Sequence, residues 1–83
     1  MGVIVYSSEN CSYCVKLKAF MQTHGLEYEL KDIHSDEDIY NEFRELGAVG
    51  TPFTIKKKRD NVEWEVLGFN ETKLKKYLNI NES

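Results

Sequence analysis

The chain has 83 residues, of which 41% are hydrophobic and 30% charged, and its formal net charge at pH 7 is -3. This length and composition suit one globular domain, so we expect a single domain over residues 1–83. The negative charge argues against nucleic acid as a partner, and the lack of an apolar run of about twenty residues argues against a membrane span.

The first part of the chain predicts a strand, a helix and a second strand. Residues 3–6 form a continuous apolar run of the buried-strand type. Residues 15–24 have helical periodicity, and Gly25 is a suitable helix end. Residues 26–32 alternate loosely, which predicts a strand parallel to the first, reached through a right-handed crossover.

A second helix is expected to open at Ser35, with Asp38 three residues later in a near capping-box arrangement. Gly47 is expected to end this helix. Its apolar stripe consists of Ile39, Tyr40, Phe43 and Leu46. The helix therefore has one face that can cover a sheet.

The last part of the chain predicts an antiparallel hairpin and a third helix. Residues 53–57 and 62–67 are read as strands joined by a turn at Asp60 and Asn61. Asn70 is a good N-cap for the final helix. The apolar residues of that helix are Leu74, Tyr77 and Leu78. The order is β-α-β-α-β-β-α, an α/β fold with a four-stranded mixed sheet covered by helices.

The chain has only two cysteines, and they stand in the sequence Cys11-Ser12-Tyr13-Cys14 between the first strand and the first helix. A helix start offers unpaired N–H groups and the positive end of the helix dipole, and both favour a thiolate. We expect Cys11, nearer the helix start and more open to solvent, to be the nucleophile. Cys14 should be partly buried and resolve the mixed disulfide.

Three segments together with this element order resemble the thioredoxin fold and, within it, the glutaredoxin family. Residues 10–15 (Asn-Cys-Ser-Tyr-Cys-Val) are similar to the family's Cys-Pro-Tyr-Cys motif, with serine in place of proline. Residues 50–53 (Gly-Thr-Pro-Phe) stand where the family keeps a cis-proline beside the active site. Residues 67–71 (Leu-Gly-Phe-Asn-Glu) are placed like its Gly-Gly segment before the last helix. The resemblance implies a dithiol–disulfide oxidoreductase.

The residues around the cysteines have expected roles in this reading. Ser12 offers a backbone N–H and a hydroxyl that would favour the thiolate. Tyr13 is expected to form an aromatic shelf for substrate, as in the family, or else to pack on the surface. Thr51-Pro52 is expected to be cis, and the main chain of Thr51 to pair with an extended substrate. The alternative is a trans proline that starts an edge strand.

Glutathione is a candidate reductant, and the resemblance places its γ-glutamyl carboxylate at the start of the last helix. Gly68, Asn70 and Glu71 would then contact it, although Asn70 is explained equally well as a helix cap. Residues 7–10 lack the lysine or arginine of many glutaredoxins, and Leu67 replaces the first glycine. These departures are similar to small glutaredoxin-like redoxins that donate electrons to ribonucleotide reductase and are recycled by thioredoxin reductase. Both electron sources stay open.

The alternative to an enzyme is a module of the same fold that binds a metal ion, an iron–sulfur cluster or a partner protein. No metal site is expected within one chain, because His24 would lie roughly 15 Å from Cys14 along a helix. We expect no tightly bound cofactor, a monomer, and a disulfide-containing protein as substrate, with ribonucleotide reductase as a candidate. The chain starts without a signal-peptide pattern, so the expected location is cytoplasmic.

Overall fold

A four-stranded mixed sheet in the order β2-β1-β3-β4 forms the centre of the computed structural model, which describes residues 2–80. The strands are β1 (Val3–Ser7), β2 (Glu29–Asp32), β3 (Phe53–Lys58) and β4 (Asn61–Leu67). β1 pairs parallel with β2 and antiparallel with β3, and β3 pairs antiparallel with β4. The predicted α/β fold and hairpin are confirmed; the predicted domain, residues 1–83, extends beyond the described range at both ends.

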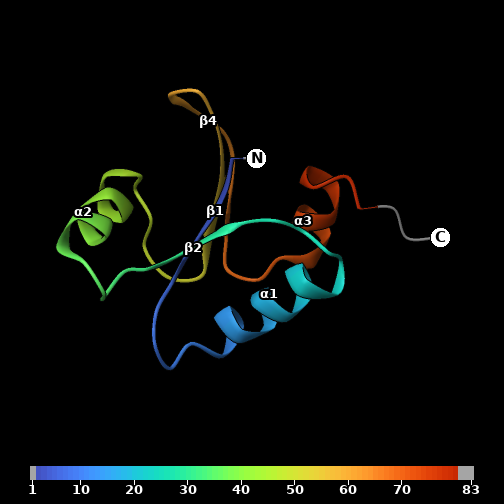
Figure 1. Cartoon of the computed structure of the whole chain (residues 1–83), viewed down its shortest axis with the longest axis horizontal. Coiled ribbons are helices and arrows are strands. Elements are labelled where there is room, and N and C mark those ends of the chain that lie inside the picture. Colours follow the sequence, from blue (N-terminus) through green and yellow to red (C-terminus); the bar gives the residue numbers. More distant parts are fainter. Residues whose placement is uncertain (1, 81–83) are drawn as a thin grey trace.

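The helices cover both faces of the sheet. They are α1 (Ser12–Thr23), α2 (Glu37–Glu45) and α3 (Glu71–Tyr77). α2 lies on one side of the sheet, and α1 and α3 lie on the other (Figure 1). Within residues 2–80, no helix has both the length and the apolarity needed to cross a membrane.

Alternation along β1 divides the apolar side chains between two cores, because successive strand residues face opposite sides. Val3 and Val5 belong to the core under α1 and α3, whereas Tyr6 belongs to the core under α2. The first core is completed by Leu17, Phe20, Met21, Val66 and Leu74, and the second by Ile33, Phe43, Phe53 and Ile55. β1 therefore packs against the helices on both faces of the sheet, and the loop that follows it leads directly to the cysteines.

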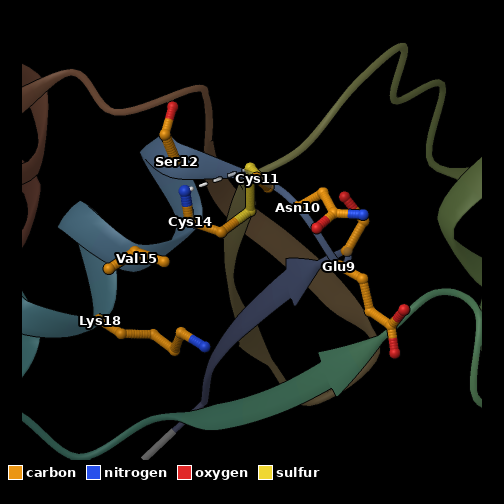
Figure 2. A pocket seen from close by; sticks show the side chains of 8 residues that line it. Glu9, Asn10, Cys11, Ser12, Cys14, Val15 and Lys18 are labelled. Carbon is orange, nitrogen blue, oxygen red and sulfur yellow. Dashed lines mark hydrogen bonds between the residues drawn. A yellow bond between two sulfur atoms is a disulfide. The ribbon is translucent and has the colours of Figure 1, made fainter.

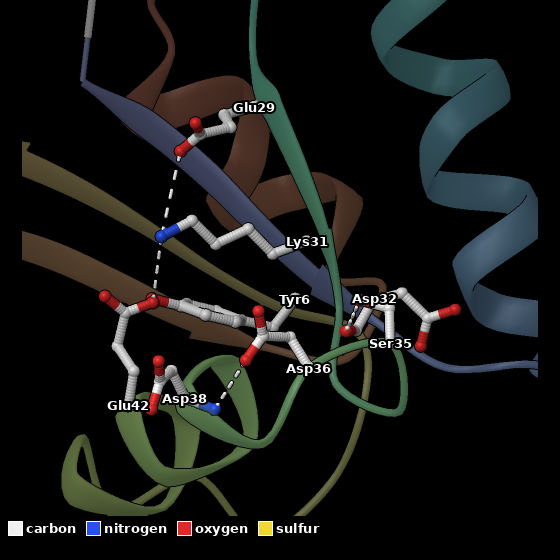
Figure 3. Close-up of polar contacts among 8 residues, drawn as sticks. All are labelled: Tyr6, Glu29, Lys31, Asp32, Ser35, Asp36, Asp38 and Glu42. Carbon is white, nitrogen blue, oxygen red and sulfur yellow. Dashed lines mark hydrogen bonds and ion pairs between the residues drawn. The ribbon is translucent and has the colours of Figure 1, made fainter.

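Two polar contacts fasten α2 to the sheet beneath it. The Tyr6 hydroxyl donates to Glu42 Oε2 at 2.7 Å, and Lys31 Nζ donates to the same oxygen at 2.9 Å. Lys31 also lies 3.9 Å from a Glu29 carboxylate oxygen. Figure 3 shows Lys31 between the two carboxylates, with the Tyr6 ring lying beside Glu42. Glu42 is thus the polar link between α2 and strands β1 and β2.

Both glycines predicted to end helices do so. Gly25 and Gly47 have positive φ angles of 62° and 80°, which glycine adopts without a Cβ clash. The Gly25 N–H donates to the Gln22 carbonyl, and the Leu26 N–H donates to the Met21 carbonyl. This pair of bonds is a Schellman motif, and it turns the chain from α1 towards β2.

The predicted starts of α1 and β2 were wrong, in both cases because the capping bonds of α1 involve residues beyond the predicted helix ends. α1 begins at Ser12 rather than at residue 15, because the Cys11 side chain caps it. β2 begins at Glu29 rather than at residue 26, because the Leu26 N–H is still bonded to the end of α1. The cysteine pair therefore occupies the first turn of a helix that is longer than expected.

The predicted capping box and the predicted turn were also wrong in detail. Asp36, not Ser35, caps α2 by accepting the Asp38 N–H at 2.8 Å. The Ser35 hydroxyl instead donates to the Asp32 carbonyl at 2.8 Å, in the preceding turn. In the hairpin the turn residues are Arg59 and Asp60, and Arg59 has a φ of 59°, while residue 61 already pairs in β4.

Candidate active site

The two cysteines lie where the loop after β1 enters α1. Cys11 is the N-cap of the helix, with an extended backbone (φ -108°, ψ 104°), and its Sγ accepts the Cys14 N–H at 3.2 Å. The two residues are joined as a disulfide, with Cα atoms 5.2 Å apart. A sulfur atom in the N-cap position receives both an orphan N–H and the positive end of the helix dipole. The local structure therefore favours negative charge on Cys11.

The two sulfur-bearing residues differ in exposure. Cys14 is 2% exposed and faces the core beneath α1, while Cys11 is only partly buried at the surface. An incoming disulfide therefore reaches Cys11 more readily than Cys14. This is the order of exposure that the sequence predicted.

A cavity of about 540 Å³ opens beside the disulfide. Its lining residues are Ser8, Glu9, Asn10, Cys11, Ser12, Cys14, Val15 and Lys18. In Figure 2 the disulfide lies between the first turn of α1 on one side and Glu9 and Asn10 on the other. Glu9 and Lys18 give the cavity one negative and one positive side chain.

Thr51 brings a hydroxyl to the nucleophilic sulfur. Its Oγ1 donates to Cys11 Sγ at 3.7 Å and lies 2.8 Å from the Ser8 hydroxyl oxygen. Reasoning from the sequence gave Thr51 only a main-chain role and did not include Ser8 in the site. The available signal was a pair of hydroxyl residues, one just before the Cys-x-x-Cys motif and one just before the sole proline.

The predicted cis bond between Thr51 and Pro52 is present. Pro52 is buried, and its carbonyl accepts the Gly68 N–H at 2.7 Å, which ties the end of β4 to the same loop. Among residues 2–80, the turn and loop hydrogen bonds include none to the main chain of Thr51. That N–H and carbonyl are free to pair with an extended chain, and substrate binding by Thr51 stays a prediction.

Ser12 and Tyr13 lie on the outer side of the first turn. Ser12 is exposed, and its side chain points away from the sulfur atoms (Figure 2). The predicted contact of the Ser12 hydroxyl with Cys11 was therefore wrong. The donors to this sulfur are the Cys14 N–H and the Thr51 hydroxyl. Tyr13 is 56% exposed, with Lys16 Nζ 5.2 Å from its ring centroid. An exposed ring beside the disulfide is suitably placed to contact a substrate, and that role also remains a prediction.

Asn70 and Glu71 make their polar contacts within α3. The Asn70 side chain accepts the Lys73 N–H at 3.1 Å as the N-cap, and Glu71 pairs with Lys75 at 3.4 Å. Neither residue lines the cavity beside the cysteines. The structure thus brings the Thr51 side chain to Cys11, while Asn70 and Glu71 have helix-capping and intrahelical contacts. Glutathione binding at the start of α3 stays a prediction.

Within residues 2–80, no group of three or more histidine, cysteine, aspartate or glutamate side chains is arranged to hold a metal ion. The two cysteines of the motif are joined to each other. This disulfide supports dithiol–disulfide chemistry at the site.

Comparisons with known proteins agree with this geometry. A family model described as Glutaredoxin matches residues 3–55. The crystal structure of a mutant of the thioredoxin-like protein BC3987 is 28% identical, with a TM-score of 0.84 and coverage of 96% of this chain and 97% of that one. The glutaredoxin from Archaeoglobus fulgidus is 26% identical, with a TM-score of 0.73 over 94% of this chain and 87% of that one.

A third structure resembles the chain in fold alone. The glutaredoxin-like protein NrdH-redoxin from Escherichia coli is 17% identical, with a TM-score of 0.78 over 100% of this chain and 99% of that one. No curated protein matches the chain in a sequence comparison. The similarity to known proteins therefore rests on the family model and the solved structures.

Proposed function

This chain belongs to the glutaredoxin family, and on that premise we propose that it is a dithiol–disulfide oxidoreductase that reduces disulfides of protein substrates. The observation that carries the proposal is the asymmetry of the cysteine pair. Cys11 is partly exposed, caps α1 and accepts an N–H on its sulfur, whereas Cys14 is 2% exposed. One cysteine is thus suited to attack and the other to resolve.

The reaction transfers two electrons from the protein to the substrate. The Cys11 thiolate attacks one sulfur of the substrate disulfide, which forms a mixed disulfide and releases the other substrate sulfur as a thiolate. Cys14 loses its proton and attacks Cys11 Sγ, which forms the internal disulfide and releases the second substrate thiolate. The substrate is reduced to two thiols, and the protein is oxidised to the Cys11–Cys14 disulfide seen in the structure.

The internal disulfide must then be reduced by an external donor of two electrons. We favour thioredoxin reductase over glutathione, because Glu9 in the cavity repels the carboxylates of glutathione and Leu67, next to Gly68, is 52% exposed where the family has glycine. Lys18 in the same cavity would attract the carboxylates of glutathione and so partly offsets Glu9. Ribonucleotide reductase is a candidate substrate, and the reducing cytoplasm is the fitting compartment.

Trapping of the mixed disulfide tests the roles of the two cysteines. We expect Cys14→Ser to accumulate a mixed disulfide through Cys11, because the resolving thiol is missing and the chain has no third cysteine. Cys11→Ser is the matched control and should trap nothing. The measurement is intact mass after incubation with a disulfide-bonded peptide. Equal trapping by Cys11→Ser would contradict the assignment.

Recycling of the oxidised protein tests the electron source. One arm contains NADPH, glutathione reductase and glutathione, and the other contains NADPH and thioredoxin reductase. Thiol alkylation followed by mass spectrometry reports the reduced fraction with time. We expect faster reduction in the thioredoxin reductase arm; faster reduction by glutathione would overturn our choice of donor, and no reduction in either arm would contradict the oxidoreductase proposal.

A further inference from the structure

A chain of two hydroxyl groups leads to the sulfur of Cys11. The Ser8 and Thr51 hydroxyl oxygens are 2.8 Å apart, and Thr51 Oγ1 is 3.7 Å from Cys11 Sγ, a distance suited to a hydrogen bond to sulfur. Both contacts are partly buried. Ser8 belongs to the loop after β1 and Thr51 to the loop before β3, and the pairing of these two strands brings the loops together.

The donor direction follows from the number of hydrogens. Each hydroxyl has a single hydrogen, and a disulfide sulfur or a thiolate can only accept. When the Thr51 hydrogen points to Cys11 Sγ, the short contact to Ser8 requires Ser8 to donate to Thr51 Oγ1. Ser8 thereby disfavours the orientation in which Thr51 turns its hydroxyl hydrogen towards Ser8.

We propose that Ser8 is a positioning residue for the nucleophile: by donating to Thr51, it holds the Thr51 hydroxyl hydrogen on the sulfur of Cys11 and so stabilises the Cys11 thiolate. The inference rests on the proposed function in that Cys11 is taken as the attacking cysteine. Hydrogen bonds to an ionised acceptor are stronger than those to a neutral one. The O–H of Thr51 therefore contributes most in the reduced, reactive protein.

Other groups also act on the Cys11 sulfur, and the test must keep them constant. The Cys14 N–H donates to it at 3.2 Å, and the start of α1 adds its dipole. Glu9 from the loop and Lys18 from α1 are the charged side chains lining the adjacent cavity. All of these remain in variants at positions 8 and 51, so their effects cancel in the comparison.

The experiment measures the alkylation rate of the reduced protein against pH, with the first modified cysteine identified by peptide mass spectrometry. The variants are Ser8→Ala, Thr51→Val, the double variant, and Ser8→Thr, which keeps a hydroxyl. Ser35→Ala is the matched control, because that hydroxyl donates at 2.8 Å to the Asp32 carbonyl and neither residue lines the cavity beside the cysteines. Circular dichroism confirms that each variant is folded.

We expect the midpoint pH of Cys11 alkylation to rise by about one unit in Thr51→Val and by about half a unit in Ser8→Ala. Ser8→Thr should restore the midpoint, and Ser35→Ala should leave it unchanged. The double variant should match Thr51→Val, because Ser8 acts through Thr51. A role of Ser8 in loop structure alone would not give this pattern.

Three results would overturn the proposal: an unchanged midpoint in Ser8→Ala, an unchanged midpoint in Thr51→Val, or additive shifts in the double variant. These outcomes are independent of substrate reduction. If the alkylation midpoints shift as expected but Cys14→Ser traps no mixed disulfide, the proposed function is contradicted and the role of Ser8 and Thr51 is supported. If Cys14→Ser traps a mixed disulfide but the alkylation midpoint of Ser8→Ala is unchanged, only the positioning role of Ser8 is contradicted.

Discussion

Thr54 has a buried hydroxyl that lowers the free energy of unfolding. It is fully buried in β3, and its Oγ1 has no hydrogen-bond partner among the described residues. Its neighbours across the sheet are Val5 on β1 and Val66 on β4, both in the core under α1 and α3. A hydroxyl that loses its water without gaining a partner destabilises the folded state.

Thr54→Val should therefore stabilise the protein. Valine has nearly the same shape, suits a strand and brings no unpaired polar group, so we expect the free energy of unfolding to rise by about 1 kcal/mol. Urea unfolding followed by circular dichroism measures the change. Thr72→Val, at an exposed position of α3, is the control and should not be stabilising. A destabilised Thr54→Val would indicate that the Thr54 hydroxyl has a partner in solution.

Within the site, the cysteine motif was predictable from residues close in sequence, and the cis Thr51-Pro52 bond from the resemblance to the family. The spacing of Cys11 and Cys14 at a strand–helix junction was sufficient to predict which of the two is more exposed, and the structure confirms that order, while their roles in the reaction stay a prediction. The contact between Ser8 and Thr51 was not predictable, because these residues are 43 positions apart. Only the β1–β3 pairing, which no local pattern encodes, brings their loops together.

At the level of elements, α2 depends on the link through Glu42. Partial burial of Glu42 opposes its charged form, but the hydrogen bonds from Tyr6 and Lys31 outweigh this and hold the pKa of Glu42 below its ordinary value of 4.5. Burial, followed by the Glu42 contact, raises the pKa of Tyr6, which keeps its hydroxyl protonated as a donor. A carboxyl group with a lowered pKa stabilises the fold above its unfolded pKa, and that stability is lost as the pH falls through the folded value.

Glu42→Gln should weaken the acid dependence of stability. When the pH is lowered from about 7 to about 3, the free energy of unfolding should fall more in the unmodified protein than in the variant. Because Glu42 is partly exposed, we expect the two falls to differ by about 1 kcal/mol or less. Urea unfolding at the two pH values measures both. Glu45→Gln, at the exposed end of α2, should behave like the unmodified protein. An equal loss in Glu42→Gln would exclude this carboxylate as a source of the acid dependence.

The order of elements was predictable because hydrophobic periodicity depends on few residues at a time. The ends were harder, since they depend on which side chain reaches a free N–H. Asp36 and Ser35 are both good N-caps by residue type, and only the position of the Asp32 carbonyl, which binds the Ser35 hydroxyl, decides between them. In α1 the cap is Cys11, a residue that cap preferences do not favour.

At the level of the whole molecule, the two cores share one sheet. β1 contributes side chains to both cores, and β3 and β4 each contribute to one, so the loss of either helix layer would expose one face of the shared sheet. The sole tryptophan, Trp64, lies on β4 and stacks on Tyr77 of α3 with centroids 5.1 Å apart. Its fluorescence therefore reports the attachment of α3, while far-UV circular dichroism reports all helices and strands.

This shared sheet predicts one cooperative unfolding transition, which substitutions in either core should shift as a whole. Leu74→Ala removes a fully buried side chain of α3 and should lower the free energy of unfolding by about 3 kcal/mol. Phe43→Leu, in the core under α2, should lower it by about 1 kcal/mol. In both variants, Trp64 fluorescence and circular dichroism should give the same urea midpoint, although Phe43 lies on the face opposite α3. If Phe43→Leu moved the circular dichroism midpoint and left that of Trp64 in place, the two layers would unfold independently, and the loops that hold Ser8 and Thr51 beside Cys11 would not be stabilised by both cores.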